Sequence, residues 1–582
     1  MKFGPFAAAK PAAAPMSGGG GARAARAKVP AWFWPGLLLV LATVAAFGPV
    51  FRAGFIWDDD AYVTGNTLLT APDGWWRIWF SAHFQSQYFP LVYTTLRLEH
   101  VLWGLNPLGY HAVNLCLHIA NALLVWGLLR RLKLPGAWLA AAIFALHPVQ
   151  VETVAWVTEL KNTESTFFYL LAVFAWLNFC GGKGGWFYGL ALALHALALC
   201  AKTTACTLPA ALWLVLWLRN EPVGWRRILQ MLPFLCLGLG LGLLSVWWEK
   251  HLGNYEPKLH LLGGPLDRLL IATHALWFYA GKIFWPGTLT FSYPRWEINV
   301  GDWRQYLWFV ACLAVTAGLW IGRRQLGRRP AAALIFFVTA LSPMLGFIPL
   351  YTFYYSYVAD HYQYLACLGP IALAAGGWTR FIEIRQIAAG AQMALVAVLL
   401  LVLGVLTFRQ CEVYRGPETL WMDTLRKNPE SWVARANLAR LWTQQGRADD
   451  AEQEYQAAIR INPSVESIHY NLGNLLAREE RYEEAMAQYH LALEIAPDKA
   501  EAYNNLGVVL NRQHRTDEAI AEFKQAIFYQ PDYADAYYNL GNACWAGHKL
   551  DAAVAAYEQA VRLNPGAELY RARLQAVTTP PK

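Results

Sequence analysis

Residues 468–497 read IHYNLGNLLAREERYEEAMAQYHLALEIAP, and residues 502–531 repeat the pattern as AYNNLGVVLNRQHRTDEAIAEFKQAIFYQP. The two stretches align at a spacing of 34 residues. In both, a glycine, an alanine, an aromatic residue and a closing proline stand at the same offsets. A fixed period of this length is typical of stacked helical repeats, and it determines the fold that we predict for the C-terminal part of the chain.

The same period extends over residues 411–582, which we predict to be one repeat domain. Five prolines mark it at intervals of 34 residues: Pro429, Pro463, Pro497, Pro531 and Pro565. The period is that of the tetratricopeptide repeat, in which glycine or alanine lets paired helices approach, an aromatic ring fills the gap, and proline ends the second helix. The length fits four full repeats, a preceding half repeat and a capping helix.

The rest of the chain has the composition of a membrane protein. The 582 residues are 56% hydrophobic and only 15% charged, with a mean hydropathy of +0.25. Residues 415–582 hold 18 Lys+Arg and 23 Asp+Glu, a net charge of −5, which leaves 30 and 17, a net charge of +13, for residues 1–414. Basic loops of this kind orient membrane helices, so we expect no nucleic-acid partner.

We predict an all-α chain of three regions. Residues 1–30, rich in Ala, Gly and Pro, are expected to form a disordered cytoplasmic arm. Residues 31–410 hold about a dozen apolar runs, and the first, 31–51, is long enough to span a bilayer. The positions of the basic loops favour 11 or 13 spans, with one of the runs near 229–248 and 266–285 re-entrant or interfacial. An odd number places the tetratricopeptide α-solenoid on the outer side.

Charged residues at or near membrane depth are costly, and they are therefore candidate functional residues. With this topology the charged candidates all lie on the outer side: Asp58, Asp59, Asp60, His147, Glu152, Glu159, Lys161, Lys202, Asp360 and His361. Three successive aspartates repel one another, which favours a carboxylate base or a metal ligand. The structural alternative, in which interfacial charges only anchor helix ends, is equally open for any single residue.

Several stretches together resemble a known family. They are FIWDDDAYVTGN (55–66), GLNPLGYHAVNLCLHIANALL (104–124), FALHPVQVETVAWVTELKN (144–162), CAKTTACTLPAAL (200–212), FYAGKIFWPGTLTFSYP (278–294) and VADHYQYLACLG (358–369). With the repeat tail, they resemble a bacterial group of polytopic proteins similar to the transmembrane and tetratricopeptide-repeat O-mannosyltransferases of animals. The resemblance covers most of residues 50–575 and implies a C-type glycosyltransferase domain at 31–410.

The resemblance implies that the sugar comes from a polyprenyl-phosphate carrier and that Asp58 and Asp59 supply the catalytic base. A Ser or Thr hydroxyl must lose its proton as it attacks, whereas the lipid phosphate leaves without a general acid. The phosphate does need positive charge. The cationic side chains on the outer face are Lys202, our first choice, and Lys161, Arg97 and His361.

The sequence departs from the family in two segments. An expected Glu-Arg-Lys-Asp reads Glu159, Leu160, Lys161, Asn162, and an expected Ala-Asp-Arg reads Ala359, Asp360, His361. Donor binding by these segments is therefore altered, or the donor differs.

Four residues are expected to support the site: Asp60, His147, Glu152 and Asp360. His147 would orient Asp58 or bind a metal, although a histidine at a helix end is more often only hydrogen-bonded. A divalent metal is left open.

The repeats contain a second candidate site. Asn437, Asn471, Asn505 and Asn539 occupy the same first-helix position in four consecutive repeats. Stacking would line up their carboxamides, and such a ladder can pair with the backbone of an extended peptide, resembling the cytosolic O-linked N-acetylglucosamine transferases. Asparagine is also common there in ordinary repeats, so a structural role is an equal alternative.

The favoured interpretation is an inner-membrane glycosyltransferase that moves mannose or another hexose to protein Ser or Thr hydroxyls, with periplasmic repeats that capture the acceptor. One alternative is a membrane-anchored scaffold without catalytic activity. Another is a transferase that acts on glycans or envelope lipids and uses the repeats to recruit partner enzymes.

Overall fold

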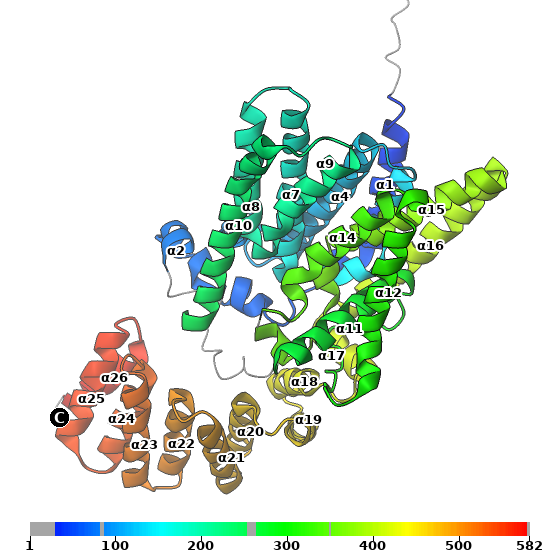
Figure 1. Ribbon diagram of the computed structural model, residues 1–582. Coiled ribbons are helices and arrows are strands. Elements are labelled where there is room, and N and C mark those ends of the chain that lie inside the picture. The colour runs from blue at the N-terminus through cyan, green and yellow to red at the C-terminus, as the bar shows by residue number, and fades with distance from the viewer. Residues whose placement is uncertain (1–29, 82–86, 253–262, 349–350, 579–582) are drawn as a thin grey trace, which may run out of the picture.

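The computed structural model describes residues 30–81, 87–252, 263–348 and 351–578. These residues form helices and connecting loops, and no strand occurs among them. Figure 1 shows a helical bundle from which an arc of short paired helices extends to the C-terminus. The prediction of an all-α chain that ends in a solenoid is confirmed.

The centre of the bundle is a set of helices that share one apolar core. Phe144, Trp176 and Ala198 are completely buried there. The longest of these helices starts at a proline preceded by Asn106, whose side chain accepts a hydrogen bond from the Leu108 N–H, as is typical of a helix start. The set comprises α4 (Pro107–Arg131), α5 (Ala137–Leu146), α7 (Leu160–Cys180), α8 (Trp186–Ala201), α9 (Leu208–Leu218) and α15 (Leu368–Arg385).

Apolar helices surround this centre and turn leucine and tryptophan side chains outward. α12 (Leu307–Ile321) buries none of its residues, and α16 (Ala389–Val413) buries only Leu403, Thr407 and Cys411. Apolar surface of this extent is stable only in contact with lipid. The other helices of this layer are α1 (Phe33–Ala46), α10 (Trp225–Leu252), α11 (Pro265–Phe284) and α14 (Arg329–Leu341).

Four helical segments are long and apolar enough to cross a bilayer: Pro107–Arg131, Trp225–Trp248, Trp303–Ile321 and Ala389–Val413. A fifth candidate is the pair Ala137–Leu146 and Pro148–Ala155, which bends by 54°. Four shorter apolar helices accompany them: Phe33–Ala46, Trp186–Ala201, Thr203–Leu218 and Arg329–Met344. The chain is a membrane protein, and the count of 11 or 13 spans stays a prediction.

The C-terminal helices form the expected tetratricopeptide array. A single helix, α17 (Pro417–Lys427), precedes four helix pairs, and α26 (Glu568–Thr578) follows them. The pairs are α18 (Trp432–Gln444) with α19 (Ala448–Ile461), α20 (Glu466–Arg478) with α21 (Tyr482–Ile495), α22 (Ala500–Arg512) with α23 (Thr516–Tyr529), and α24 (Ala534–Ala546) with α25 (Leu550–Leu563).

The repeated glycine explains how each pair closes. A Cβ atom added to Gly473 would lie 2.7 Å from the Tyr489 ring. Gly507 meets Phe523 at the same distance. The ring occupies the space that any larger side chain would need, so the pairing of glycine with an aromatic residue sets the distance between the helices.

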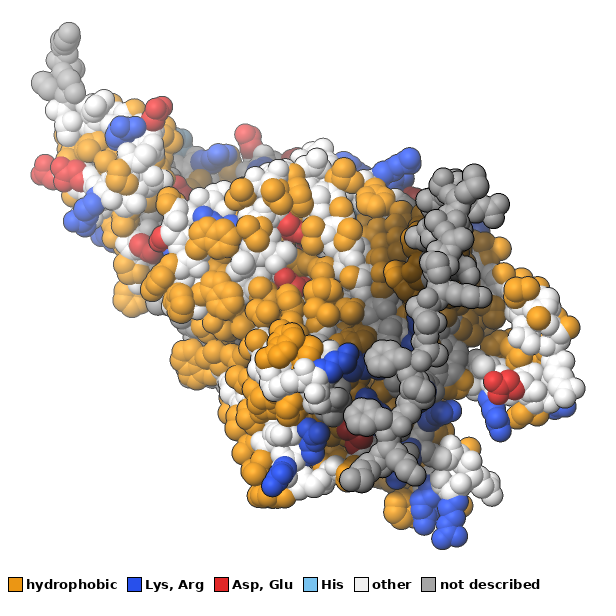
Figure 2. Space-filling view, turned by 90° about the horizontal axis from the view of Figure 1, so that it is seen from above, with side chains coloured by type: hydrophobic (Ala, Val, Ile, Leu, Met, Phe, Trp, Pro, Cys, Tyr) orange, Lys and Arg blue, Asp and Glu red, His pale blue; other side chains and the backbone are white. Residues whose placement is uncertain are grey.

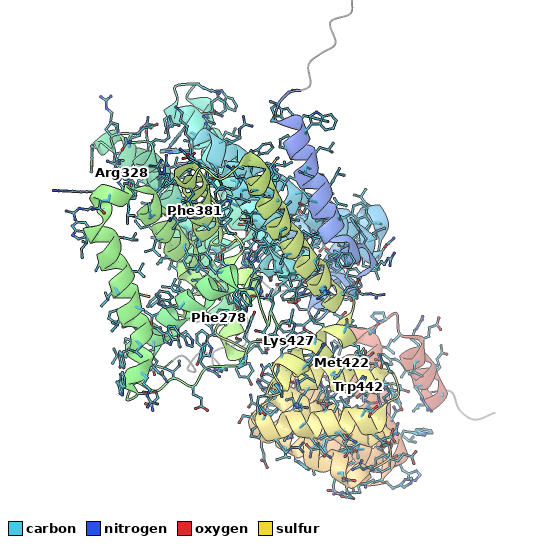
Figure 3. The ribbon with its side chains drawn as sticks, turned by 90° about the vertical axis from the view of Figure 1, so that its right-hand side faces the viewer. Phe278, Arg328, Phe381, Met422, Lys427 and Trp442 are labelled. Carbon is cyan, nitrogen blue, oxygen red and sulfur yellow. The ribbon has the colours of Figure 1, made fainter. Side chains whose placement is uncertain are left out.

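The first repeats are joined to the loops at one end of the membrane domain. The Lys427 ammonium donates to the Leu289 carbonyl at 2.6 Å, and the Asn428 amide donates to the Ser292 carbonyl at 3.0 Å. Trp421 packs in a core with residues of the loop after α1. Figure 3 shows Met422, Lys427 and Trp442 at this junction, whereas Arg328 and Phe381 lie at the opposite end.

Candidate functional site

Three successive aspartates in the loop after α1 lie in three different environments. Asp60 is exposed, and Asp59 is completely buried. Asp58 is half-buried, and its Oδ1 atom is buried without a hydrogen-bond partner among the described residues. Burial raises the pKa of Asp58 to about 6, although the nearby Lys161 ammonium acts in the opposite direction. Asp58 is thus the member of the three that has a buried carboxylate oxygen without a hydrogen-bond partner among the described residues.

Asp59 holds the loop that carries Asp58 in place. Its Oδ2 accepts from the Ile56 N–H at 2.8 Å. Its Oδ1 accepts from the Thr158 N–H at 2.9 Å and from the Thr158 hydroxyl at 2.6 Å. With both oxygens occupied, Asp59 ties its own loop to the segment before α7. The predicted acidic pair is thus divided into an available carboxylate and a positioning carboxylate.

Trp57 contributes to the same arrangement. Its backbone has φ +43°, a left-handed conformation that is costly for a tryptophan. The indole stacks on Trp156 with ring centroids 5.6 Å apart, and it meets Trp421 of α17 edge-on at 5.9 Å. These contacts place the acidic loop between the membrane domain and the first helix of the solenoid.

Glu159 lies at the centre of a cluster of charges. Its Oε1 is 2.9 Å from the Lys161 ammonium, and its Oε2 is 3.6 Å from the Lys202 ammonium. Burial alone would raise the pKa of Glu159, but the positive charges of His361, Lys161 and Lys202 lower it to about 2. Asn162 also donates to Glu159 and accepts from Lys202 at 2.8 Å. The carboxylate therefore fixes two ammonium groups side by side.

A second acidic group approaches the cluster from α6 (Val151–Ala155), which follows the bend after α5. Glu152 Oε1 lies 3.1 Å from His361 Nδ1, and Glu152 Oε2 accepts from the His361 N–H at 3.0 Å. The neighbouring Asp360 is buried, and both of its oxygens accept from the Tyr293 hydroxyl, at 3.0 and 3.1 Å. The bend at His147 aims the acidic end of this segment into the protein.

The cationic groups of the cluster line a cavity of about 120 Å³. Lys161, Lys202 and His361 form its polar wall, with Thr203 and Thr204 beside them. Burial lowers the pKa of Lys202 to about 8, so its ammonium is held in a dry and weakly compensated environment. Convergent cations in such a cavity suit a phosphate group.

Two of the predicted residues do not join the cluster. The Arg97 guanidinium donates to the carbonyls of Leu68 and Ala71, and it thereby holds the loop between α1 and α3 (Pro90–Trp103) on α3. Its prediction as a phosphate ligand is not supported, because these bonds and burial occupy it. His147 uses Nε2 on the Ile283 carbonyl at 2.8 Å and Nδ1 on the Val149 N–H, so its role is structural.

Asp60 is exposed, and its contacts differ from those of Asp58 and Asp59. Asp60 accepts from the Thr64 hydroxyl at 3.1 Å and lies 3.9 Å from the Arg440 guanidinium of the first repeat. In the part of the chain that the structure describes, no group of three or more His, Cys, Asp or Glu side chains is arranged to hold a metal ion.

The asparagines of the solenoid are connected to one another. Asn505 donates to the Tyr470 hydroxyl at 3.0 Å and to Asn474 at 2.8 Å. Asn539 donates to Asn504 at 2.9 Å, and Asn504 donates to Asn505. Asn437 instead donates within its own helix, to the Val433 carbonyl. A peptide that used these amides would have to compete with existing hydrogen bonds.

Sequence reasoning did not select Thr158, Tyr293 or Trp156 as parts of the site. All three belong to stretches that carry the family resemblance, but hydroxyl and indole groups have no spacing pattern of their own. Asn162 was noticed only as a departure from the family. In the structure its amide donates to the His361 carbonyl at 3.0 Å, so the two departing positions touch.

Comparison with known proteins agrees with this two-part organisation. Tetratricopeptide-repeat models match residues 440–479, 464–527 and 504–568. Protein O-mannosyl-transferase TMTC2 of Homo sapiens is 27% identical over 310 residues, which cover 46% of this chain and 36% of that protein. Protein O-mannosyl-transferase Tmtc1 of Drosophila melanogaster is 29% identical over 300 residues, 47% of this chain and 34% of the fly protein.

A longer match is protein O-mannosyl-transferase F38B6.6 of Caenorhabditis elegans, 22% identical over 446 residues, with 73% of this chain and 62% of that protein covered. A crystal structure of MamA protein is 20% identical and covers 25% of this chain and 80% of its own, with a TM-score of 0.24. The chain spans about a third of the length of the human and fly relatives. It is a membrane protein with C-terminal tetratricopeptide repeats, similar to animal proteins named protein O-mannosyl-transferases.

Proposed function

We propose that the chain is a membrane glycosyltransferase that moves a hexose, such as mannose, from a polyprenyl-phosphate carrier to a Ser or Thr hydroxyl of a protein. The observation that carries the proposal is a buried Asp58 oxygen without a hydrogen-bond partner near Lys161, which itself lines a cavity together with Lys202 and His361. A base and a phosphate site next to each other match the two needs of this reaction. The names of the animal relatives support the same class of reaction.

The chemistry requires one base and no general acid. The acceptor hydroxyl oxygen forms a bond to the anomeric carbon, and its proton passes to the Asp58 carboxylate. The bond between the anomeric carbon and the phosphate oxygen breaks, and its electron pair leaves with the lipid phosphate. The developing charge on that phosphate is stabilised by the ammonium groups in the cavity wall.

The two lysines have different tasks. Lys161 is neutralised by Glu159 at 2.9 Å and also faces the Trp156 ring at 5.6 Å. Lys202 lies farther from Glu159, at 3.6 Å, so its positive charge is less compensated by this carboxylate when it is protonated. We therefore propose Lys202 as the main phosphate ligand, with Lys161 and His361 as supporting groups.

The repeats are proposed to hold the protein acceptor on the side of the membrane where the site opens. The solenoid is attached to the loops that carry the site, through Lys427, Asn428 and Trp421. The basic ends of the apolar helices favour a cytoplasmic location for the opposite face. The proposed location is thus an inner membrane, with the N-terminus cytoplasmic and the repeats periplasmic. A reporter that is active only in the periplasm, fused after Pro565, tests this orientation.

The acceptor groove has its own test. Changing three ladder asparagines to alanine removes amides that contribute about 0.5 to 1.5 kcal/mol each when they bind a peptide. Long protein acceptors should then bind about tenfold less tightly or worse, while a short hydroxyl-bearing peptide is modified as before. The variant is Asn471→Ala, Asn505→Ala, Asn539→Ala, and the matched control is Gln456→Ala, Gln525→Ala, Gln559→Ala on the second helices.

Intact-mass glycoproteomics of envelope proteins, with and without the chain, tests the proposed reaction in cells. The proposal expects hexose on Ser or Thr of envelope proteins only in cells that carry the chain. Unchanged protein masses, together with free replacement of Asp58, would favour the scaffold. Loss of hexose from glycans or lipids alone would favour the other transferase alternative.

A further inference from the structure

A second cavity lies between the membrane helices, and it shares no lining residue with the cavity of the candidate site. Its volume is about 950 Å³, near the upper end of the roughly 300–1,000 Å³ that small-molecule sites occupy. α9, α14 and α15 form its walls and α7 closes its inner side, with mainly apolar side chains such as Leu214, Phe336 and Leu373. Protein interiors contain few voids of this size, so an apolar space this large offers room for hydrocarbon chains.

The cavity ends at a basic rim. Arg130, Lys133, Arg329 and Arg380 line it together with a single carboxylate, Glu383. Glu383 pairs with Arg380 at 3.7 Å. Within the described ranges, none of the other three cations lies within 4.0 Å of a carboxylate, and all three are exposed. The rim therefore carries uncompensated positive charge at the mouth of an apolar space.

The rim is fixed by tight packing of the turn between α4 and α5. Lys133 has φ +55° and Gly136 has φ +70°, both left-handed. A Cβ atom at Gly136 would lie 2.5 Å from the Ala375 carbonyl oxygen of α15. Only glycine permits this approach, which locks the basic turn onto the wall of the cavity.

The dimensions fit one leaflet of a bilayer. Along α15 the lining runs from Leu368 to Glu383, and its uncharged part, from Leu368 to Gly377, is about 14 Å long at 1.5 Å per residue. Half of a hydrocarbon core about 30 Å thick is about 15 Å. Figure 3 places Arg328 and Phe381, neighbours of the rim, at the end of the molecule away from the repeats. Seen from above, Figure 2 shows Lys and Arg side chains among apolar ones on that face.

We propose that this cavity is a binding site for an anionic diacyl phospholipid of the leaflet opposite the candidate site. The acyl chains lie along Leu214, Phe336 and Leu373, and the phosphate of the headgroup lies among Arg130, Lys133 and Arg329. Basic pockets between membrane helices bind phospholipid headgroups in this way. The proposal does not depend on the proposed transferase function.

The position of the rim separates this lipid from the sugar donor. Lys161 begins α7 at the candidate site, and Cys180 ends that helix 19 residues later, about 28 Å along its axis. A donor phosphate at the rim would therefore be far from Asp58. The occupant is a resident lipid and not a bound substrate.

The test is a native mass-spectrometry titration of the full chain, delipidated in detergent, with phosphatidylglycerol and with phosphatidylethanolamine of the same acyl chains. The parent should bind phosphatidylglycerol at least tenfold more tightly. That preference should disappear in the triple variant Arg130→Gln, Lys133→Gln, Arg329→Gln. The matched control is the triple variant Arg226→Gln, Arg323→Gln, Arg324→Gln. It removes three cations on the same side that do not line the cavity, and it should keep the preference for phosphatidylglycerol.

A second pair of variants tests the cavity itself. Ala372→Trp fills the space and should abolish binding of phosphatidylglycerol, whereas Leu395→Trp on the outward face of α16 should not. The proposal is overturned by equal affinity of the parent for both lipids, by equal loss of preference in the control, or by full binding in Ala372→Trp. Competitive displacement of phosphatidylglycerol by a polyprenyl phosphate at equal concentration would also overturn it, because the site would then belong to the carrier lipid.

Discussion

Replacement of Thr158 by valine tests how the acidic loop is held. The Thr158 hydroxyl donates to Asp59 at 2.6 Å, and the Thr158 N–H donates to the same oxygen at 2.9 Å. Valine has nearly the same shape but no hydroxyl, so the variant loses only the side-chain bond. A hydrogen bond to a charged group contributes about 1.5 to 3 kcal/mol. Thr158→Ser keeps the bond and loses one methyl group, which costs about 0.8 kcal/mol.

The consequence for the proposed transfer is larger than the consequence for stability. Asp58 adjoins Asp59, and a displacement of about 1 Å in a reacting group can lower a rate about 100-fold. We expect Thr158→Val to lower kcat at least about tenfold with little change in the KM for the donor. Thr158→Ser should remain close to the parent.

The assay measures initial rates of transfer from a polyprenyl-phosphate sugar to a peptide, with thermal unfolding in detergent as the stability control. If Thr158→Val loses stability but transfers sugar as fast as Thr158→Ser, Asp59 does not position Asp58. The assignment of Asp58 as the available carboxylate and Asp59 as the positioning carboxylate would then be wrong.

Two further predictions concern the charges of the site. A base must be deprotonated and burial raises the pKa of Asp58 to about 6, so kcat/KM should fall as the pH drops below about 6. The pKa of Lys202 is lowered to about 8, so kcat/KM should fall again above about pH 8, where Lys202 loses its charge. A flat profile from pH 5 to 9 would contradict both assignments. Asn162→Asp places a carboxylate against Glu159 and should destabilise the protein by about 1 to 3 kcal/mol. Adding His361→Arg should restore part of that loss. Thermal unfolding of both single variants and the double variant shows whether the two effects differ from their sum.

The solenoid could be predicted in detail because its determinants are local and periodic. In three successive repeats a glycine such as Gly473 and an aromatic residue such as Tyr489 recur at the offsets that bring them into contact. Convergence of the charged residues could also be predicted, because burial of a charge is costly and these residues stand near helix ends that the basic loops place on one side of the membrane domain. Glu159, Lys202 and His361, from three separate segments, do meet.

The separate roles of the charged residues within the site could not be predicted. Whether a carboxylate is free, like Asp58, or fully bonded, like Asp59, depends on a backbone N–H 99 residues away along the chain. The same holds for Arg97, whose partners are backbone carbonyls of a loop without a sequence signature. Contacts to main-chain atoms of distant segments leave no pattern in side-chain identity. The candidate residues could therefore be identified from the sequence, but not the role of each.

The most direct test of the central claim is transfer by purified chain in which Asp58 is replaced by asparagine. The assay uses a radiolabelled hexose on a polyprenyl phosphate, a hydroxyl-bearing peptide, and donor-binding measurements on the same preparation. The proposed mechanism predicts that Asp58→Asn binds the donor normally but transfers about 100-fold to 10,000-fold more slowly, because the base is lost. Transfer at the parental rate by Asp58→Asn, or no transfer by the parent with any polyprenyl-phosphate hexose, would contradict it.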